Sequence, residues 1–126
     1  MKKMLSILCA IMIIVSLTAC SSDFDGSRTG NDNEFSMEYK VLNKTDSQDL
    51  KLQNGDKINA KIIIDGGTLA IKIQKDDEEP IYESDGISAS NEFEVEVEES
   101  GIYTITVTGK KAKGSVNFNV VSSHYD

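Results

Sequence analysis

The chain is poor in residues that catalyse reactions or cross-link small domains: 126 residues include two cysteines, one histidine, one proline and no tryptophan. Cys9 and Cys20 both fall in the first twenty residues, so the rest of the chain has no disulfide, no cysteine metal cluster and no thiol nucleophile. The one histidine, His124, lies beside the C-terminus, where chains fray. Because no G-x-S-x-G, glycine-rich phosphate loop or H-E-x-x-H motif occurs either, we predict a non-enzyme without a cofactor. A small hydrolase that uses two carboxylates is the remoter alternative.

Positive charge is also scarce. Thirteen Lys and Arg residues stand against 21 Asp and Glu residues, which gives a formal net charge of −8. Such an acidic surface repels the phosphates of nucleic acids and of anionic lipid headgroups. We therefore expect no nucleic-acid partner.

Residues 1–19 predict a secretory signal peptide. Lys2 and Lys3 form a positive start, and Met4–Leu17 is a run without charge. This run is shorter than the roughly 20 apolar residues that a transmembrane helix needs. Its removal leaves about 107 residues, which is room for one domain.

The segment Leu17-Thr18-Ala19-Cys20 resembles the lipobox of bacterial lipoproteins. In that family the cysteine thiol receives a diacylglyceryl group, and a peptidase cuts just before it. The resemblance implies a chain anchored to the lipid bilayer through acylated Cys20, on the extracytoplasmic face of the cell membrane. The alternative is an ordinary secreted protein in which Cys20 is an incidental thiol.

Residues 20–33 predict a flexible tether after the lipidated cysteine. They are rich in Ser, Asp, Gly and Asn and contain one large apolar residue, Phe24, a composition typical of flexible linkers. The folded domain is therefore expected over residues 34–121, with residues 122–126 as a C-terminal tail.

From residue 35 onward, apolar residues alternate with polar ones, which is the period of half-buried β-strands. The alternating segments lie at residues 35–41, 50–52, 58–64, 69–73, 93–97, 103–107 and 116–120, with a short strand at 81–82. Asp65-Gly66-Gly67 and Gly109–Gly114 predict turns. We predict an all-β domain, a single antiparallel β-sandwich of about seven or eight short strands.

The pattern F-x-V-x-V followed by G-x-Y-x-I-x-V, here Phe93–Val97 and Gly101–Val107, resembles the GOLD-like (Golgi-dynamics-like) β-sandwich family. Immunoglobulin-like sandwich modules of small bacterial lipoproteins are similar. The resemblance implies an interaction module and carries over no catalytic residue. Together with the anchor, it predicts a non-catalytic binding module at the cell envelope, with an unknown protein or glycan as its partner.

Three glutamates, Glu94, Glu96 and Glu98, alternate along one predicted strand. Residues two apart on a strand lie about 7 Å apart, so these like charges repel each other. Lys57, Lys61 and Lys72 would offset the repulsion if their strand lay alongside. The glutamates indicate either a surface for a basic partner or a divalent cation, or a solvated face that prevents edge-to-edge aggregation.

A run of four acidic residues predicts the tip of a turn and offers an alternative function. Calcium prefers several oxygen ligands, and Asp76, Asp77, Glu78 and Glu79 supply carboxylates. The run lacks the alternating D-x-D-x-D-G spacing of a calcium loop. A calcium-binding envelope module therefore remains an alternative to a solvated turn.

One aromatic residue is a candidate for ligand contact. Tyr82 follows Ile81 directly, and neighbouring residues on a strand point to opposite faces. One of the two side chains should be exposed, and an exposed tyrosine ring could stack on a ligand.

Overall fold

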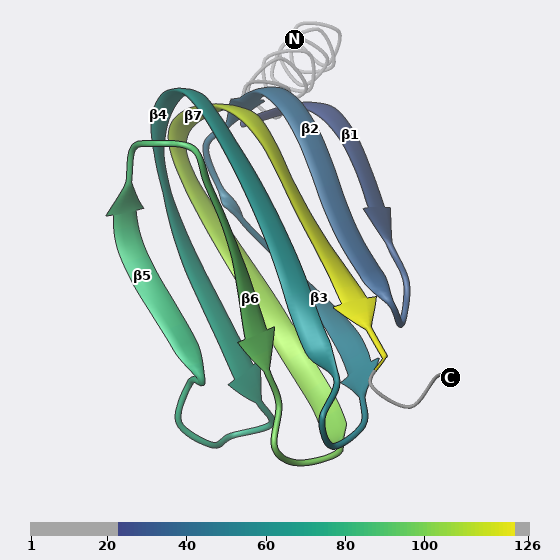
Figure 1. Ribbon diagram of the computed structural model, residues 1–126. Coiled ribbons are helices and arrows are strands. Elements are labelled where there is room, and N and C mark those ends of the chain that lie inside the picture. Colours follow the sequence, from purple (N-terminus) through teal and green to yellow (C-terminus); the bar gives the residue numbers. More distant parts are fainter. Residues whose placement is uncertain (1–22, 123–126) are drawn as a thin grey trace, which may run out of the picture.

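The alternating apolar residues produce seven antiparallel strands in the computed structural model, which describes residues 23–122 (Figure 1). The strands are β1 (Phe24–Gly30), β2 (Glu34–Leu42), β3 (Thr45–Leu52), β4 (Lys57–Lys75), β5 (Tyr82–Ile87), β6 (Asn91–Glu96) and β7 (Gly101–Val121). The predicted all-β, antiparallel class is confirmed. The predicted signal peptide, lipobox, Cys20 and residues 123–126 lie outside the described residues.

Two of the strands are long and belong to both layers of the sandwich. β4 has 19 residues and β7 has 21, and they pair along their lengths from Lys57 opposite Val121 to Lys75 opposite Tyr103. Halfway along, both bend over together, so that each supplies half a strand to each layer (Figure 1). We call the end with this bend the arch end and the opposite end the loop end.

Each layer is completed by shorter strands. Layer A joins β1, β2 and β6 to the first half of β4 and the second half of β7. Layer B joins β3 and β5 to the second half of β4 and the first half of β7. The inner faces of both layers form one apolar core, in which Phe35 of β2 and Phe118 of β7 stack with their ring centres 6.1 Å apart.

The turns predicted at Asp65-Gly66-Gly67 and Gly109–Gly114 are wrong, because both segments lie inside continuous strands. Gly67 (φ 69°) and Gly114 (φ 140°) have positive φ, a backbone conformation that glycine tolerates and other residues rarely adopt. A Cβ atom on Gly67 would lie 2.2 Å from the carbonyl oxygen of Lys111. The glycines therefore let two paired strands bend together with their backbones in close contact.

The tether predicted over residues 20–33 is wrong for residues 24–30, which form β1 along the edge of layer A. An edge strand needs hydrogen bonds on one side only, and natural edges often carry polar residues, so composition does not reveal it. Arg28 of this strand covers the edge of the core. Its guanidinium lies 4.9 Å from the centre of the Phe35 ring and donates from Nε to Oδ2 of Asp46 at 2.8 Å.

Candidate functional site

The loop end of the sandwich brings together segments that are distant in sequence. The turns after β3, β4 and β6 and the last residues of β7 all lie there (Figure 1). The turn between β1 and β2 is joined to them by two backbone hydrogen bonds, from the amide of Lys51 to the oxygen of Asp32 and from the amide of Val120 to the oxygen of Asn33. This end therefore gathers side chains from at least four connections.

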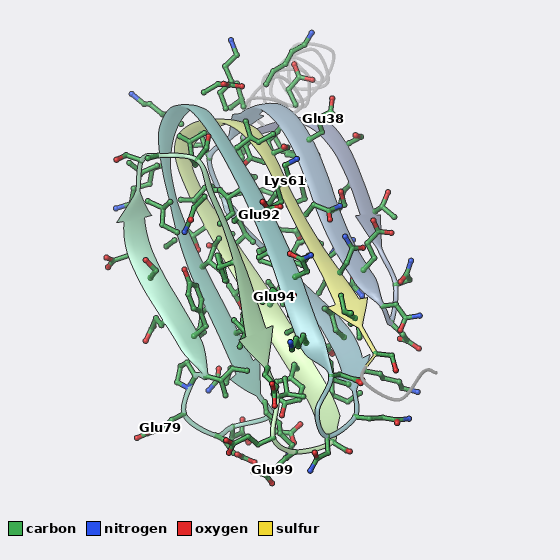
Figure 2. The ribbon with its side chains drawn as sticks, viewed as in Figure 1. Glu38, Lys61, Glu79, Glu92, Glu94 and Glu99 are labelled. Carbon is green, nitrogen blue, oxygen red and sulfur yellow. The ribbon has the colours of Figure 1, made fainter. Side chains whose placement is uncertain are left out.

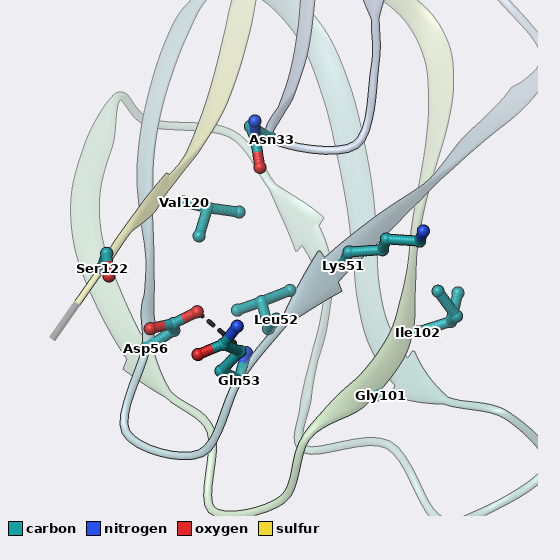
Figure 3. Close-up of a pocket in the computed structure, with 9 residues that line it drawn as sticks. All are labelled: Asn33, Lys51, Leu52, Gln53, Asp56, Gly101, Ile102, Val120 and Ser122. Atoms are coloured by element: carbon teal, nitrogen blue, oxygen red, sulfur yellow. Dashed lines mark hydrogen bonds between the residues drawn. The ribbon is translucent and has the colours of Figure 1, made fainter. Parts of the chain in front are cut away.

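A cleft of about 720 Å³ opens at the loop end, which is the size of a small-molecule site or of a pocket for a few side chains of a protein partner (Figure 3). Its apolar lining comes from Leu52, Ile102 and Val120. The remaining lining residues are Asn33, Lys51, Gln53, Asp56, Gly101 and Ser122. The cleft thus pairs an apolar surface with one cation, one carboxylate and several neutral hydrogen-bonding groups.

Asp56 organises the turn beside the cleft. It is 5% exposed, and its Oδ2 accepts a hydrogen bond of 2.8 Å from the backbone amide of Gln53 (Figure 3). Its own amide donates to the oxygen of Gln53 at 2.9 Å, and its carbonyl oxygen accepts from the amide of Val97 at 2.9 Å. Because a buried carboxylate is costly unless it is hydrogen-bonded, Asp56 both fixes this turn and joins it to the turn after β6.

A second hollow at the loop end, of about 360 Å³, collects the acidic residues that the sequence separates. It is lined by Lys75, Glu78, Ile81, Glu96, Val97, Glu98, Glu99 and Tyr103. Lys75 is the cation among them: its Nζ lies 3.1 Å from Oε2 of Glu78 and 3.8 Å from Oδ2 of Asp76. The hydrogen bond with Glu78, and then the charges of Glu78, Glu99 and Asp76, raise the pKa of Lys75 against an opposing desolvation effect.

Tyr103 fixes the turn that carries Glu98 and Glu99. Its hydroxyl donates a hydrogen bond of 2.6 Å to the carbonyl oxygen of Glu99. Burial raises the pKa of Tyr103, although the hydrogen bond to Glu99 acts in the opposite direction. The ring belongs to the core and only its hydroxyl serves the turn.

The predicted glutamate face is only partly assembled. Glu94 and Glu96 are exposed on β6, whereas Glu98 lies beyond the end of that strand, in the turn. In register with β6, Lys57 stands opposite Glu96. Lys61 stands opposite Glu92 (Figure 2), so the predicted complement is confirmed for these two lysines. It is wrong for Lys72, which stands opposite Glu83 of β5. β6 pairs with β4 alone and is an edge of layer A; exposed charges on such an edge discourage pairing with another chain.

The acidic residues of the predicted calcium turn, Asp76, Asp77, Glu78 and Glu79, are all exposed at the loop end. Glu79 and Glu99 both mark this end in Figure 2. Within residues 23–122, no group of three or more His, Cys, Asp or Glu side chains is arranged to hold a metal ion. The ammonium of Lys75 is the cation that meets two of these carboxylates.

Tyr82 is half-buried, and its contact with a ligand stays a prediction. Its ring stacks on Phe93 with centres 4.4 Å apart and an interplanar angle of 19°, which closes the open side of the sandwich between β5 and β6. Its neighbour Ile81 is the exposed member of the pair, at 43%. None of the aromatic side chains in residues 23–122 is exposed.

The lining of the cleft was not predicted from sequence, because its members come from the ends of different strands and no local motif joins them. The one available signal was the segment Gln53-Asn54-Gly55-Asp56, whose composition indicates a turn. That signal places a turn in the chain but not the cleft beside it.

Comparison with known proteins assigns no family: no family model matches the chain and no curated protein matches it. Among solved structures, Aeromonas hydrophila PliG, a periplasmic lysozyme inhibitor of g-type lysozyme, is similar at 17% identity and a TM-score of 0.45, over 80% of this chain and 89% of that one. A CBM4 structure is similar at 13% identity and a TM-score of 0.42, over 79% and 77% of the two chains. TmCBM61 in complex with β-1,4-galactotriose is similar at 17% identity and 0.42, over 78% and 70%.

These structural similarities do not assign a function to any residue of this chain. A separate observation concerns the membrane: within residues 23–122 no helix is long and apolar enough to span a bilayer.

Proposed function

We propose that this chain is a bacterial lipoprotein, held through acylated Cys20 on the extracytoplasmic face of the cell membrane, and that its sandwich is a non-catalytic binding module for an envelope protein. The observation that carries the binding role is the cleft at the loop end, with its apolar lining and its polar rim. The anchor is supported by the signal-like residues 1–19 and the lipobox Leu17–Cys20.

The arrangement of the two ends supports this combination. The described chain starts at Asp23, which lies at the arch end: its carbonyl oxygen accepts a hydrogen bond from the amide of Asn43, next to the bend. The cleft lies at the opposite end (Figures 1 and 3). An anchor at Cys20 would therefore hold the cleft away from the membrane, where an envelope partner can reach it.

A protein partner is favoured over a glycan by the aromatic residues. Sugar rings are commonly bound by stacking on exposed aromatic faces. Four of the seven aromatic residues in 23–122 are buried, and the other three are half-buried: Tyr82 and Phe93 stack on each other and Lys44 lies over Phe24. The cleft instead offers Leu52, Ile102 and Val120 beside Lys51, a mixture that suits an apolar side chain flanked by an acidic one.

The anchor is tested by labelling cells that express the chain with a palmitate analogue, beside a Cys20→Ala variant. We expect label on the wild-type chain only. Equal absence of label, with protein released into the medium, would contradict the anchor and make Cys20 an incidental thiol.

The binding role is tested by recovering partners from a detergent extract of the envelope with the wild-type chain and two matched variants. Ile102→Glu places a charge in the cleft lining, whereas Ile63→Glu places the same charge at an exposed position (38%) on β4. We expect a defined partner with the wild type and Ile63→Glu and its loss with Ile102→Glu. Equal recovery by both variants would place the binding surface elsewhere.

A further inference from the structure

The arch end carries a group of five exposed lysines that the sequence scatters over three segments. They are Lys40, Lys44, Lys110, Lys111 and Lys113. Their closeness follows from pairing at the bend: Lys110 stands opposite Thr68 and Lys113 opposite Gly66. Across the same end, the amide of Lys111 donates to Oδ1 of Asn43 at 3.0 Å and the amide of Gly109 donates to the oxygen of Lys44 at 2.9 Å.

The first described residues of the chain lie against this group. Lys44 extends over Phe24, with Nζ 5.8 Å from the ring centre. Because β1 begins at Phe24, only four residue steps separate it from Cys20, which span at most roughly 14 Å. A lipid on Cys20 would therefore hold the arch end, rather than the loop end, next to the bilayer.

Charge is distributed unequally between the two ends. Residues 23–122 contain 11 basic and 20 acidic side chains. At the arch end the five lysines are matched by five acids: Asp23, Asp25, Glu38, Asp65 and Asp85. The rest of the domain has six cations and fifteen acids, including the acidic turns of the loop end (Figure 2). Near the bend the five lysines therefore offset the acids around them, and lysine side chains reach farther from the backbone than aspartates do.

We propose that, in the anchored chain, the arch end docks on anionic phospholipid headgroups through Lys40, Lys44, Lys110, Lys111 and Lys113 and so directs the cleft away from the bilayer. This inference rests on the proposed anchor. The lysines are attracted to a negative leaflet, and the acidic loop end is repelled by it, so both effects turn the domain the same way. Because its net charge is negative, the domain without acylated Cys20 would not bind an anionic bilayer. The lipid on Cys20 already holds the domain at the bilayer, so the lysines need only orient it.

The test uses the full lipidated chain, purified from membranes and reconstituted into vesicles of phosphatidylcholine, or of phosphatidylcholine and phosphatidylglycerol in equal parts. A fluorophore is attached to one introduced cysteine, Ser88→Cys in the connection from β5 to β6 near the arch end or Glu79→Cys at the loop end. Energy transfer to a labelled lipid headgroup then reports each end's distance from the surface. In anionic vesicles we expect higher transfer from position 88 and lower transfer from position 79 than in neutral vesicles, and the difference should vanish at high salt.

Charge-neutralising variants test which lysines are responsible. Replacing Lys110, Lys111 and Lys113 by Gln should abolish the difference between vesicle types. The matched control replaces Lys51, Lys57 and Lys61 by Gln, has the same net charge, creates no pair of like charges across β4 and β6, and should keep the difference. A milder pair, Lys110→Gln with Lys113→Gln, should reduce the difference if the triple variant fails to fold.

Equal transfer in both vesicle types, or equal behaviour of the two triple variants, would overturn the docking. Flotation of the protein with the vesicles is scored separately. Protein that floats but shows no difference in transfer refutes the docking alone, whereas protein that does not float with either vesicle type refutes the anchor and the docking together.

Discussion

At the arch end two strands pass from one layer to the other without a break, whereas at the loop end every strand stops and a turn begins. The arch end is held by backbone contacts: a Cβ on Gly114 would lie 2.0 Å from the carbonyl oxygen of Ile63. At the loop end, side chains add to the backbone hydrogen bonds between the turns, through Asp56 with Gln53, Tyr103 with Glu99 and Lys75 with Glu78.

The two tyrosines of these ends show the same difference. Tyr39 pairs with Gly114 near the bend, is 4% exposed, and its hydroxyl is buried without a hydrogen-bond partner among the described residues. Tyr103 at the loop end has its partner in Glu99. Continuous strands leave few free backbone groups for a buried hydroxyl, whereas turns supply them. The turns of the loop end therefore supply free polar groups for a site, while the glycines of the bend tolerate few substitutions.

The largest expected effect concerns glycine at the bend. Gly67 and Gly86 have similar φ, 69° and 62°, but a Cβ on Gly67 would meet the backbone of Lys111 at 2.2 Å and one on Gly86 would meet nothing within 4 Å. Gly67→Ala should cost about 3 kcal/mol or more of unfolding free energy, whereas Gly86→Ala should cost about 1 kcal/mol, for positive φ alone. Urea unfolding measures both, and equal losses would mean that the bend is not crowded.

The second effect is a loss of stability at alkaline pH. Burial raises the pKa of Tyr39 to about 12 and raises that of Tyr103. Since both values lie above the unfolded value of about 10, the folded state keeps protons that the unfolded state releases. The stabilisation is complete below pH 10 and is lost as pH rises toward 12, by roughly 2 to 3 kcal/mol for Tyr39.

This loss is checked by measuring the free energy of unfolding from about pH 9 to about pH 12, a range that spans the unfolded and folded pKa values of Tyr39. Tyr39→Phe should remove most of the alkaline loss. An unchanged pH profile in that variant would contradict the assignment to Tyr39.

A third effect compares the two tyrosines at neutral pH. Tyr103→Phe removes a hydrogen bond of 2.6 Å and should cost about 1 kcal/mol. Tyr39→Phe removes a buried hydroxyl without a partner in the described residues and should stabilise by up to about 1 kcal/mol. If the urea midpoint shifted in the same direction for both variants, the proposed difference between the tyrosine at the arch end and the tyrosine at the loop end would be contradicted.

The smallest effect concerns the ion pair of the loop end. The pair of Lys75 and Glu78 is 3.1 Å long, and the Glu78 side chain is 54% exposed. Lys75→Gln should therefore lower the free energy of unfolding only slightly, and less at high salt. Lys40→Gln, at an exposed position on β2, is the control. A salt-independent loss much larger than that of the control would show that Lys75 has a structural role beyond an exposed pair.

Period-two alternation correctly located the strands that cover the core, because burying one face of a strand requires it. It predicted strands over residues 35–41 and 93–97, close to the observed β2 (Glu34–Leu42) and β6 (Asn91–Glu96). It could not distinguish a hairpin from a bend at residues 65–67, since glycine serves both and only the presence of β7 alongside decides. It also missed β1, whose pairing uses backbone groups that any sequence supplies.

The site was less predictable than the fold. Glu98 and Glu78 meet in one hollow only because the turns after β4 and β6 lie side by side, a relation set by strand order and not by local sequence. The cleft depends in the same way on Leu52, Ile102 and Val120 arriving from three strand ends. Alternation of apolar and polar residues predicts which face of a strand is buried, but it does not predict which strands lie next to each other. It therefore cannot predict which strand ends meet at the cleft.

The central claim, that the loop end is the binding end of an anchored module, is tested most directly by photo-crosslinking in living cells. A photoreactive amino acid replaces Gln53 at the cleft or, as the control, Ser27 on the exposed part of β1. We predict one discrete crosslinked partner from position 53 and none from position 27. No crosslink from position 53, or the same partner from both positions, would contradict the account.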